Sequence, residues 1–102
     1  MAVTFFGDNM NPYSDTDREE DGESWIRIFD HSVINSELVW HRDINSRKIE
    51  VLEGTGWQLQ MDNELPIELV AGETYTIPSM SFHRILKGED YLIIKITETQ
   101  CS

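Results

Sequence analysis

The sequence predicts an all-β domain, built as a sandwich or barrel of short strands. Runs of β-favouring residues are separated by turn-forming residues about every eight to twelve positions, which is the spacing of such folds. Several runs alternate apolar and polar residues, so each strand is expected to have one buried and one solvated face. No segment shows the period of a long amphipathic helix. A chain of 102 residues has room for one hydrophobic core.

Alternating residues and turn signals predict eight strands along the chain. Alternation is clearest at 48–51, where Lys, Ile, Glu and Val follow one another, and at 57–61, where polar Gln58 and Gln60 separate Trp, Leu and Met. Asparagine, glycine and proline between the runs mark the turns. The predicted strands cover residues 25–29, 37–41, 47–52, 56–61, 67–70, 74–77, 82–86 and 91–97.

The first 24 residues differ from the rest. A strand is expected at 3–6, and residues 8–24 have the composition of an irregular polar loop. This loop holds seven acidic residues against one base, Arg18, which favours a solvated arm over a specific acidic docking segment. We therefore divide the chain into an N-terminal strand and acidic arm, 1–24, and a barrel, 25–102.

The charge and the apolar runs limit the expected partners. A net charge of −11 repels phosphate backbones and anionic lipids, so neither nucleic acid nor a membrane is expected as a partner. No apolar run approaches the roughly 20 residues that cross a bilayer, and we expect no signal peptide. Because Cys101 is the single cysteine, no internal disulfide can form, and a cytoplasmic location is expected.

Three side chains form the main candidate site: His41, Asp43 and His83. His41 and Asp43 are two residues apart on an expected strand and should project to the same face. His83 belongs to a later strand that follows a turn at Gly72 and Pro78. Two imidazoles and one carboxylate suit Fe(II) and also accept Mn, Ni or Zn. Without further context, a histidine and an aspartate at this spacing are weak evidence for a metal site.

The stretch 37–98 resembles the cupin superfamily. The first cupin motif is H-x-H, three or four residues, Glu, six residues and Gly; here His41-Arg42-Asp43, Arg47 and Gly54 occupy that frame. The resemblance implies a cupin-type double-stranded β-helix barrel, similar to a jelly roll. It also implies that Asp43 replaces the second histidine as a metal ligand, whereas Arg47 stands at the glutamate position and cannot bind a cation.

The second cupin motif is Gly, five residues, Pro-x-Gly, two residues, His, three residues and Asn. Gly72, Pro78 and His83 match this frame, while Met80 replaces the second glycine and Lys87 the asparagine. The implied metal set therefore falls from four ligands to three, namely His41, Asp43 and His83.

Further polar residues are candidates for substrate binding. Beside a metal, Arg47 would anchor an anionic substrate group. Asp43 and Arg47 flank the turn at Asn45 and are expected to form an ion pair. In this alternative the carboxylate of Asp43 pairs with Arg47 and binds no metal. Gln58 and Gln60 share one strand face, which either lines the pocket or faces solvent.

Two function classes stay open at this point. The first is a small metal-dependent cupin that acts on a small polar or anionic molecule, with oxygenase, isomerase or lyase chemistry all compatible with the fold. The second is a non-catalytic, metal-free cupin that binds a ligand or has a structural role. For either class the resemblance implies a homodimer, formed through outer sheet faces or through swapped N-terminal strands at residues 2–6.

Overall fold

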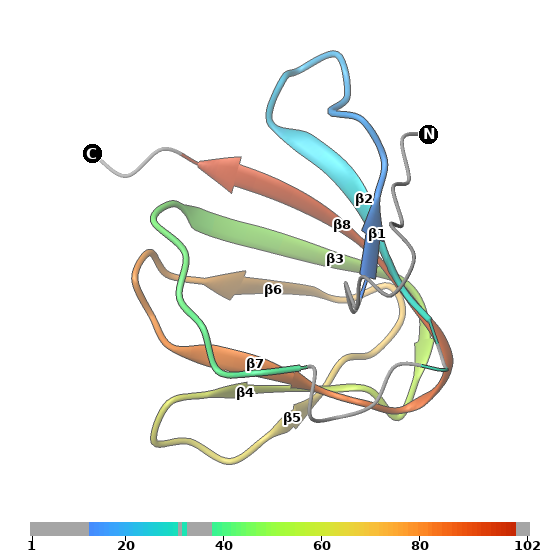
Figure 1. Cartoon of the computed structure of the whole chain (residues 1–102), viewed down its shortest axis with the longest axis vertical. Helices are drawn as coiled ribbons and strands as arrows, with labels where there is room; N and C mark the ends of the chain where they lie inside the picture. The colour runs from blue at the N-terminus through green and yellow to red at the C-terminus, as the bar shows by residue number, and fades with distance from the viewer. Residues whose placement is uncertain (1–12, 31, 33–37, 100–102) are drawn as a thin grey trace, which may run out of the picture.

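The computed structural model describes residues 13–30, 32 and 38–99, which form two antiparallel β-sheets (Figure 1). The larger sheet contains β1 (Tyr13–Asp15), β2 (Ser24–Phe29), β3 (Ser46–Thr55), β6 (Thr74–Ile77) and β8 (Glu89–Thr99), in the order β1-β2-β8-β3-β6. The smaller sheet contains β4 (Gln58–Met61), β5 (Ile67–Glu68) and β7 (His83–Leu86), in the order β5-β4-β7. Within the described ranges, no helix is long and apolar enough to cross a membrane.

The core lies between the two sheets. The central strand β8 buries Leu92, Ile94 and Ile96, each at most 2 % exposed, because alternate residues of a strand point to the same face. On the opposite side, Trp57 is fully buried, and its indole Nε1 donates a hydrogen bond to the carbonyl of Glu89 at 3.0 Å. Each large apolar side chain buried in this way contributes about 1.5–3 kcal/mol. In Figure 1 the larger sheet lies above the smaller one.

Seven of the eight expected strands are present, with their ends shifted by a few residues. The exception is the expected strand 37–41: within its described part only His41 pairs, through a single bridge to His83. The reason is that the segment 38–45 passes from the smaller sheet to the start of β3 and touches β7 at one point (Figure 1). His41 and Asp43 therefore do not share a strand face, although both contribute to the same site.

The prediction of an irregular loop at 8–24 is wrong for residues 13–15. Tyr13–Asp15 forms β1, which pairs with β2 at the edge of the larger sheet. An ion pair between Asp15 and Arg27 joins the two strands, with Nε and Oδ1 2.7 Å apart. Residues 16–23 form no strand, as expected. The strand expected at 3–6 lies outside the described residues, and the division at residue 24 stays a prediction.

Candidate metal centre

A two-way backbone bridge brings His41 and His83 together. The amide of His41 donates to the carbonyl of His83 at 3.0 Å, and the amide of His83 donates to the carbonyl of His41 at 2.9 Å. Two residues further on, the amide of Met80 donates to the carbonyl of Asp43 at 2.7 Å. These bonds hold segment 38–45 against the β6–β7 loop and the start of β7, so the three side chains are positioned by backbone contacts.

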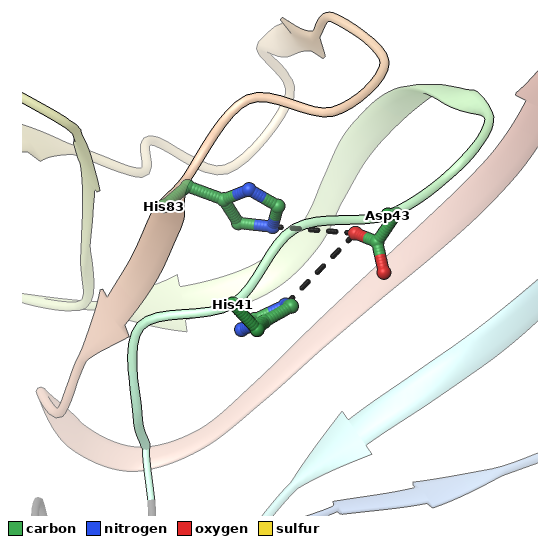
Figure 2. Close-up of side chains that lie close together, drawn as sticks. All are labelled: His41, Asp43 and His83. Carbon is green, nitrogen blue, oxygen red and sulfur yellow. Dashed lines mark ion pairs between the residues drawn. The ribbon is translucent and has the colours of Figure 1, made fainter.

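The three side chains converge on one small volume (Figure 2). Oδ2 of Asp43 lies 3.4 Å from Nε2 of His83 and 3.9 Å from Nε2 of His41. The two imidazole rings meet edge to face, with their centres 4.3 Å apart. Two ligands that bind one ion at about 2.0–2.2 Å lie about 3–3.6 Å apart, so the His83–Asp43 distance already fits a shared ion. The His41 side chain is 44 % exposed and has room to rotate and close the longer distance.

The other ring nitrogen of each histidine fixes its tautomer. Nδ1 of His41 lies 3.0 Å from the carbonyl oxygen of Val39, and Nδ1 of His83 lies 2.8 Å from that of Ser81. A carbonyl oxygen only accepts hydrogen bonds, so in both neutral rings Nδ1 carries the proton. Each Nε2 therefore directs a lone pair towards Asp43. This arrangement is the usual one in metal-binding histidines.

The protonation state of His83 also suits a ligand. Burial lowers the pKa of this imidazole, and electrostatic interactions with the neighbouring His41 ring and with Arg47 lower it further. The hydrogen bond to Ser81 and the charge of Asp43 act in the opposite direction but are outweighed. His83 is thus neutral at neutral pH, and its Nε2 lone pair is available without the release of a proton.

A carboxylate oxygen that accepts no hydrogen bond supports the fit of the donor set to a cation. Oδ2 of Asp43 is buried and has no hydrogen-bond partner, although it faces both Nε2 atoms. A buried carboxylate oxygen that accepts no hydrogen bond is costly even with Nη1 of Arg47 3.4 Å away, and two lone pairs directed at it add repulsion. A divalent ion bound between the three atoms would remove both penalties. The chemistry and the spacing of this donor set therefore fit Fe, Mn, Ni or Zn.

Arg47 forms the expected ion pair with Asp43, at 3.4 Å between Nη1 and Oδ2. Its hydrogen bonds go elsewhere: Nε and Nη2 both donate to Oε2 of Glu98, at 3.2 and 3.1 Å. Burial raises the pKa of Glu98, but hydrogen bonds and charges from Arg47 and Arg18 outweigh it and hold that pKa below its usual value. Glu98 thus neutralises the arginine that stands next to the candidate metal centre.

The sequence did not identify Glu98 as part of the site. Glu98 lies directly opposite Arg47 in the β3–β8 register. The only signal available beforehand was an acid near the end of the last expected strand, and register cannot be read from such a pattern.

A cavity of about 270 Å³ lies between the sheets beside the three side chains. His41, His83 and Arg47 line it, and so do two residues that sequence analysis did not identify, Tyr13 and Arg27. The rest of its wall is apolar and consists of Phe29, Leu38, Val39 and isoleucines from β3, β6, β7 and β8. The candidate centre therefore opens onto a space that can hold a small molecule.

Gln58 and Gln60 are not among the described residues that line this cavity, so the structure does not bring them to the candidate centre and their role in substrate binding stays a prediction. Gln60 accepts a hydrogen bond from Nε of Arg84 at 2.8 Å and donates one to the carbonyl of Glu64 at 3.0 Å. The two glutamines share the face of β4 opposite Leu59, which is 2 % exposed and points into the core. Both glutamine side chains are half-buried on that face.

Comparisons with known proteins give structural neighbours only. No family model and no curated protein sequence matches the chain. The DMSP lyase DddQ from Ruegeria pomeroyi superposes with a TM-score of 0.71 at 13 % identity, over 94 % of this chain and 51 % of that one. A chain from the DMSP lyases RdDddP and RnDddQII gives 0.66 at 14 % identity, over 76 % and 38 %. This chain thus spans about half or less of the lyase chains it matches.

A protein of nearly equal length is also similar. An RmlC-like cupin family protein from Methanocaldococcus jannaschii, with a double-stranded β-helix fold, superposes with a TM-score of 0.66 at 12 % identity. The match covers 98 % of this chain and 90 % of that one. Identities of this size establish a shared fold and leave the chemistry to be argued from the site.

Proposed function

We propose that this chain, which has the cupin fold, is a small metal-binding protein that holds one divalent ion with His41, Asp43 and His83. The cavity next to that ion would bind a small polar or anionic molecule. When bound, such an ion polarises a coordinated oxygen or lowers the pKa of a coordinated water. The DMSP lyases among the structural neighbours are compatible with lyase chemistry, beside the oxygenase and isomerase types that the fold also supports.

One observation carries the proposal. The Nε2 lone pairs of two histidines and a buried carboxylate oxygen that accepts no hydrogen bond point at the same place. The backbone carbonyls of Val39 and Ser81 orient both rings for this purpose. Polar side chains that merely filled a degenerate pocket would be expected to hydrogen-bond with one another instead.

The contact between Arg47 and Asp43 supports a second candidate function. Nη1 of Arg47 lies 3.4 Å from Oδ2 of Asp43, so the carboxylate is partly neutralised without a metal. In this case the chain would be a non-catalytic, metal-free cupin that binds a ligand or has a structural role. We prefer the metal centre because this contact does not satisfy Oδ2 with a hydrogen bond.

Metal content separates the two candidates. Purified protein should contain one equivalent of Fe, Mn, Ni or Zn by elemental analysis, or take it up after treatment with a chelator. The metal should be lost in His83→Ala and kept in His31→Ala, which replaces the third histidine of the sequence. Wild-type protein that cannot be loaded with any of the four ions would refute the proposed metal centre.

A further inference from the structure

Arginines line the cavity beside the candidate metal centre. Its described lining residues include two arginines, Arg27 from β2 and Arg47 from β3, and no carboxylate. The acids that pair with these arginines, Asp15 and Glu98, are not among the lining residues. This contrasts with the net charge of −11 for the whole chain. Because low-dielectric walls focus the field inside a cavity, such a lining favours an anionic ligand.

Of the two arginines, Arg27 has donors left for a ligand. It is 9 % exposed, and its Nε and Nη2 donate to the two oxygens of Asp15 at 2.7 and 2.9 Å. Its guanidinium carbon also lies 3.6 Å from the centre of the Tyr13 ring. Among the described residues, its Nη1 has no hydrogen-bond partner. Arg47 differs, because its Nε and Nη2 donate to Glu98 while its Nη1 contacts Asp43.

These contacts hold Arg27 in one position before any ligand arrives. Asp15 fixes one edge of the guanidinium plane, and the Tyr13 ring covers one of its faces. A donor held in this way loses little conformational freedom when it binds a carboxylate. The arrangement therefore suits recognition of an acid group and does more than an ordinary ion pair between neighbouring strands would require.

The other residues that line the cavity indicate the chemistry of the rest of the ligand. Phe29 and five isoleucines make much of the cavity wall apolar. Its volume of about 270 Å³ is just below the range for drug-sized ligands, which is about 300–1,000 Å³. Such a space suits a compact aliphatic or aromatic body.

We propose that this cavity binds a small organic carboxylate, whose acid group is held by Arg27 and whose apolar body packs against the isoleucines. The inference rests on the proposed function for the choice of this cavity as the ligand site. It departs from the expectation that Arg47 is the anion anchor, and it adds Tyr13 and Asp15 as positioning residues for Arg27. The acid group is thereby assigned to the β1–β2 wall of the cavity.

The test is calorimetric titration with isovalerate and benzoate and with their neutral amides, on metal-free and on zinc-loaded protein. Wild-type protein should bind each carboxylate about tenfold or more tightly than its amide, because charge-assisted hydrogen bonds are the stronger ones. Arg27→Gln should remove this preference in both preparations. The double variant Asp15→Asn/Arg27→Gln should do the same without leaving Asp15 unpaired, and it provides the test if the single variant does not fold.

Arg84→Gln is the matched control, because Arg84 binds Gln60 and does not line the cavity. Equal affinity for carboxylates and amides, or unchanged affinity in both Arg27 variants, would overturn the inference. Carboxylate binding that requires the metal and is unchanged in the Arg27 variants would also overturn the inference, but it would support the metal centre. Binding that depends on Arg27 in a protein that takes up no metal would support it while refuting the metal centre.

Discussion

His41 and His83 are joined by a pair of backbone hydrogen bonds, at 3.0 and 2.9 Å, although half of the barrel lies between them in the sequence. The bridge is the single pairing between the described part of segment 38–45 and strand β7. It places two imidazoles edge to face, 4.3 Å between centres, next to one carboxylate. This long-range backbone contact therefore brings together the two histidines of the candidate metal centre.

Replacement of Asp43 by asparagine should abolish stabilisation by metal with little effect on the metal-free protein. An ion present at about 100 times its dissociation constant stabilises the wild type by about 2.7 kcal/mol, which raises the unfolding temperature by about 10 °C or more. The variant lacks the anionic ligand and should show no such rise. Thermal unfolding with and without Mn or Zn measures the difference, and a full metal-induced rise in Asp43→Asn would contradict the ligand assignment.

Removal of the Arg47 charge should tighten metal binding. Nη1 of Arg47 lies 3.4 Å from the oxygen that would bind the ion, so its charge opposes a dication. In Arg47→Gln this repulsion is absent, and Arg47 no longer neutralises the negative charge of Glu98. We therefore expect the affinity for the metal ion to rise by about tenfold. The double variant Arg47→Gln/Glu98→Gln should return towards the wild-type value. Competition with a chromogenic chelator measures all three, and weaker binding in Arg47→Gln would show that Arg47 supports the site.

Glu98 should make stability depend on pH in the acidic range. Its pKa is lower in the folded chain than its usual value of 4.5, so the stabilisation is fully present above pH 4.5. It is lost as the pH falls through the folded pKa, because the unfolded chain binds the proton first. Urea unfolding between about pH 3 and 7 should show a shallower decline in Glu98→Gln than in wild type. Glu53→Gln, an exposed acid on β3, is the charge-matched control and should follow the wild-type curve.

Gly88 should tolerate no side chain. A Cβ added there would lie within 2.4 Å of backbone atoms of Thr55, Gly56 and Trp57, which cannot move without opening the β3–β4 turn. Gly88→Ala should therefore cost about 3 kcal/mol or more, at the upper end for overpacked sites. In Gly54→Ala the close atom is the tip of the Leu92 side chain, which can rotate away, so a smaller loss is expected. Chemical denaturation compares the two, and equal losses would contradict this reasoning.

A homodimer is predicted from the cupin resemblance and should appear in sedimentation as twice the 11.9 kDa of one chain. Deletion of residues 2–6 distinguishes the two modes of association. A dimer held by swapped N-terminal strands should dissociate, whereas one held by outer sheet faces should persist. A monomer in the full chain at micromolar concentration would contradict the prediction.

Much of the fold could be read from local pattern. Alternation at 48–51 and 57–61 predicted β3 and β4, because one face of each strand is buried. The pattern predicts segment 38–45 less well. A histidine and an aspartate two residues apart are equally compatible with a strand and with a connecting segment that makes a single bridge. The three residues of β1 were missed because their acidic surroundings resemble a solvated loop and their stability comes from a partner strand.

The sequence by itself determined the all-β class, the turns and the three candidate metal ligands, since periodicity, glycine positions and motif spacing are local properties. Only the tertiary structure decided which groups surround those ligands. Arg47 lies opposite Glu98 through the β3–β8 register, and Arg27 is paired with Asp15 through β1. Gln60 faces away because the pleat of β4 directs its neighbour Leu59 inward. Register and pleat depend on strands that are distant in sequence, so the cavity lining and its charge appear only once the barrel is closed.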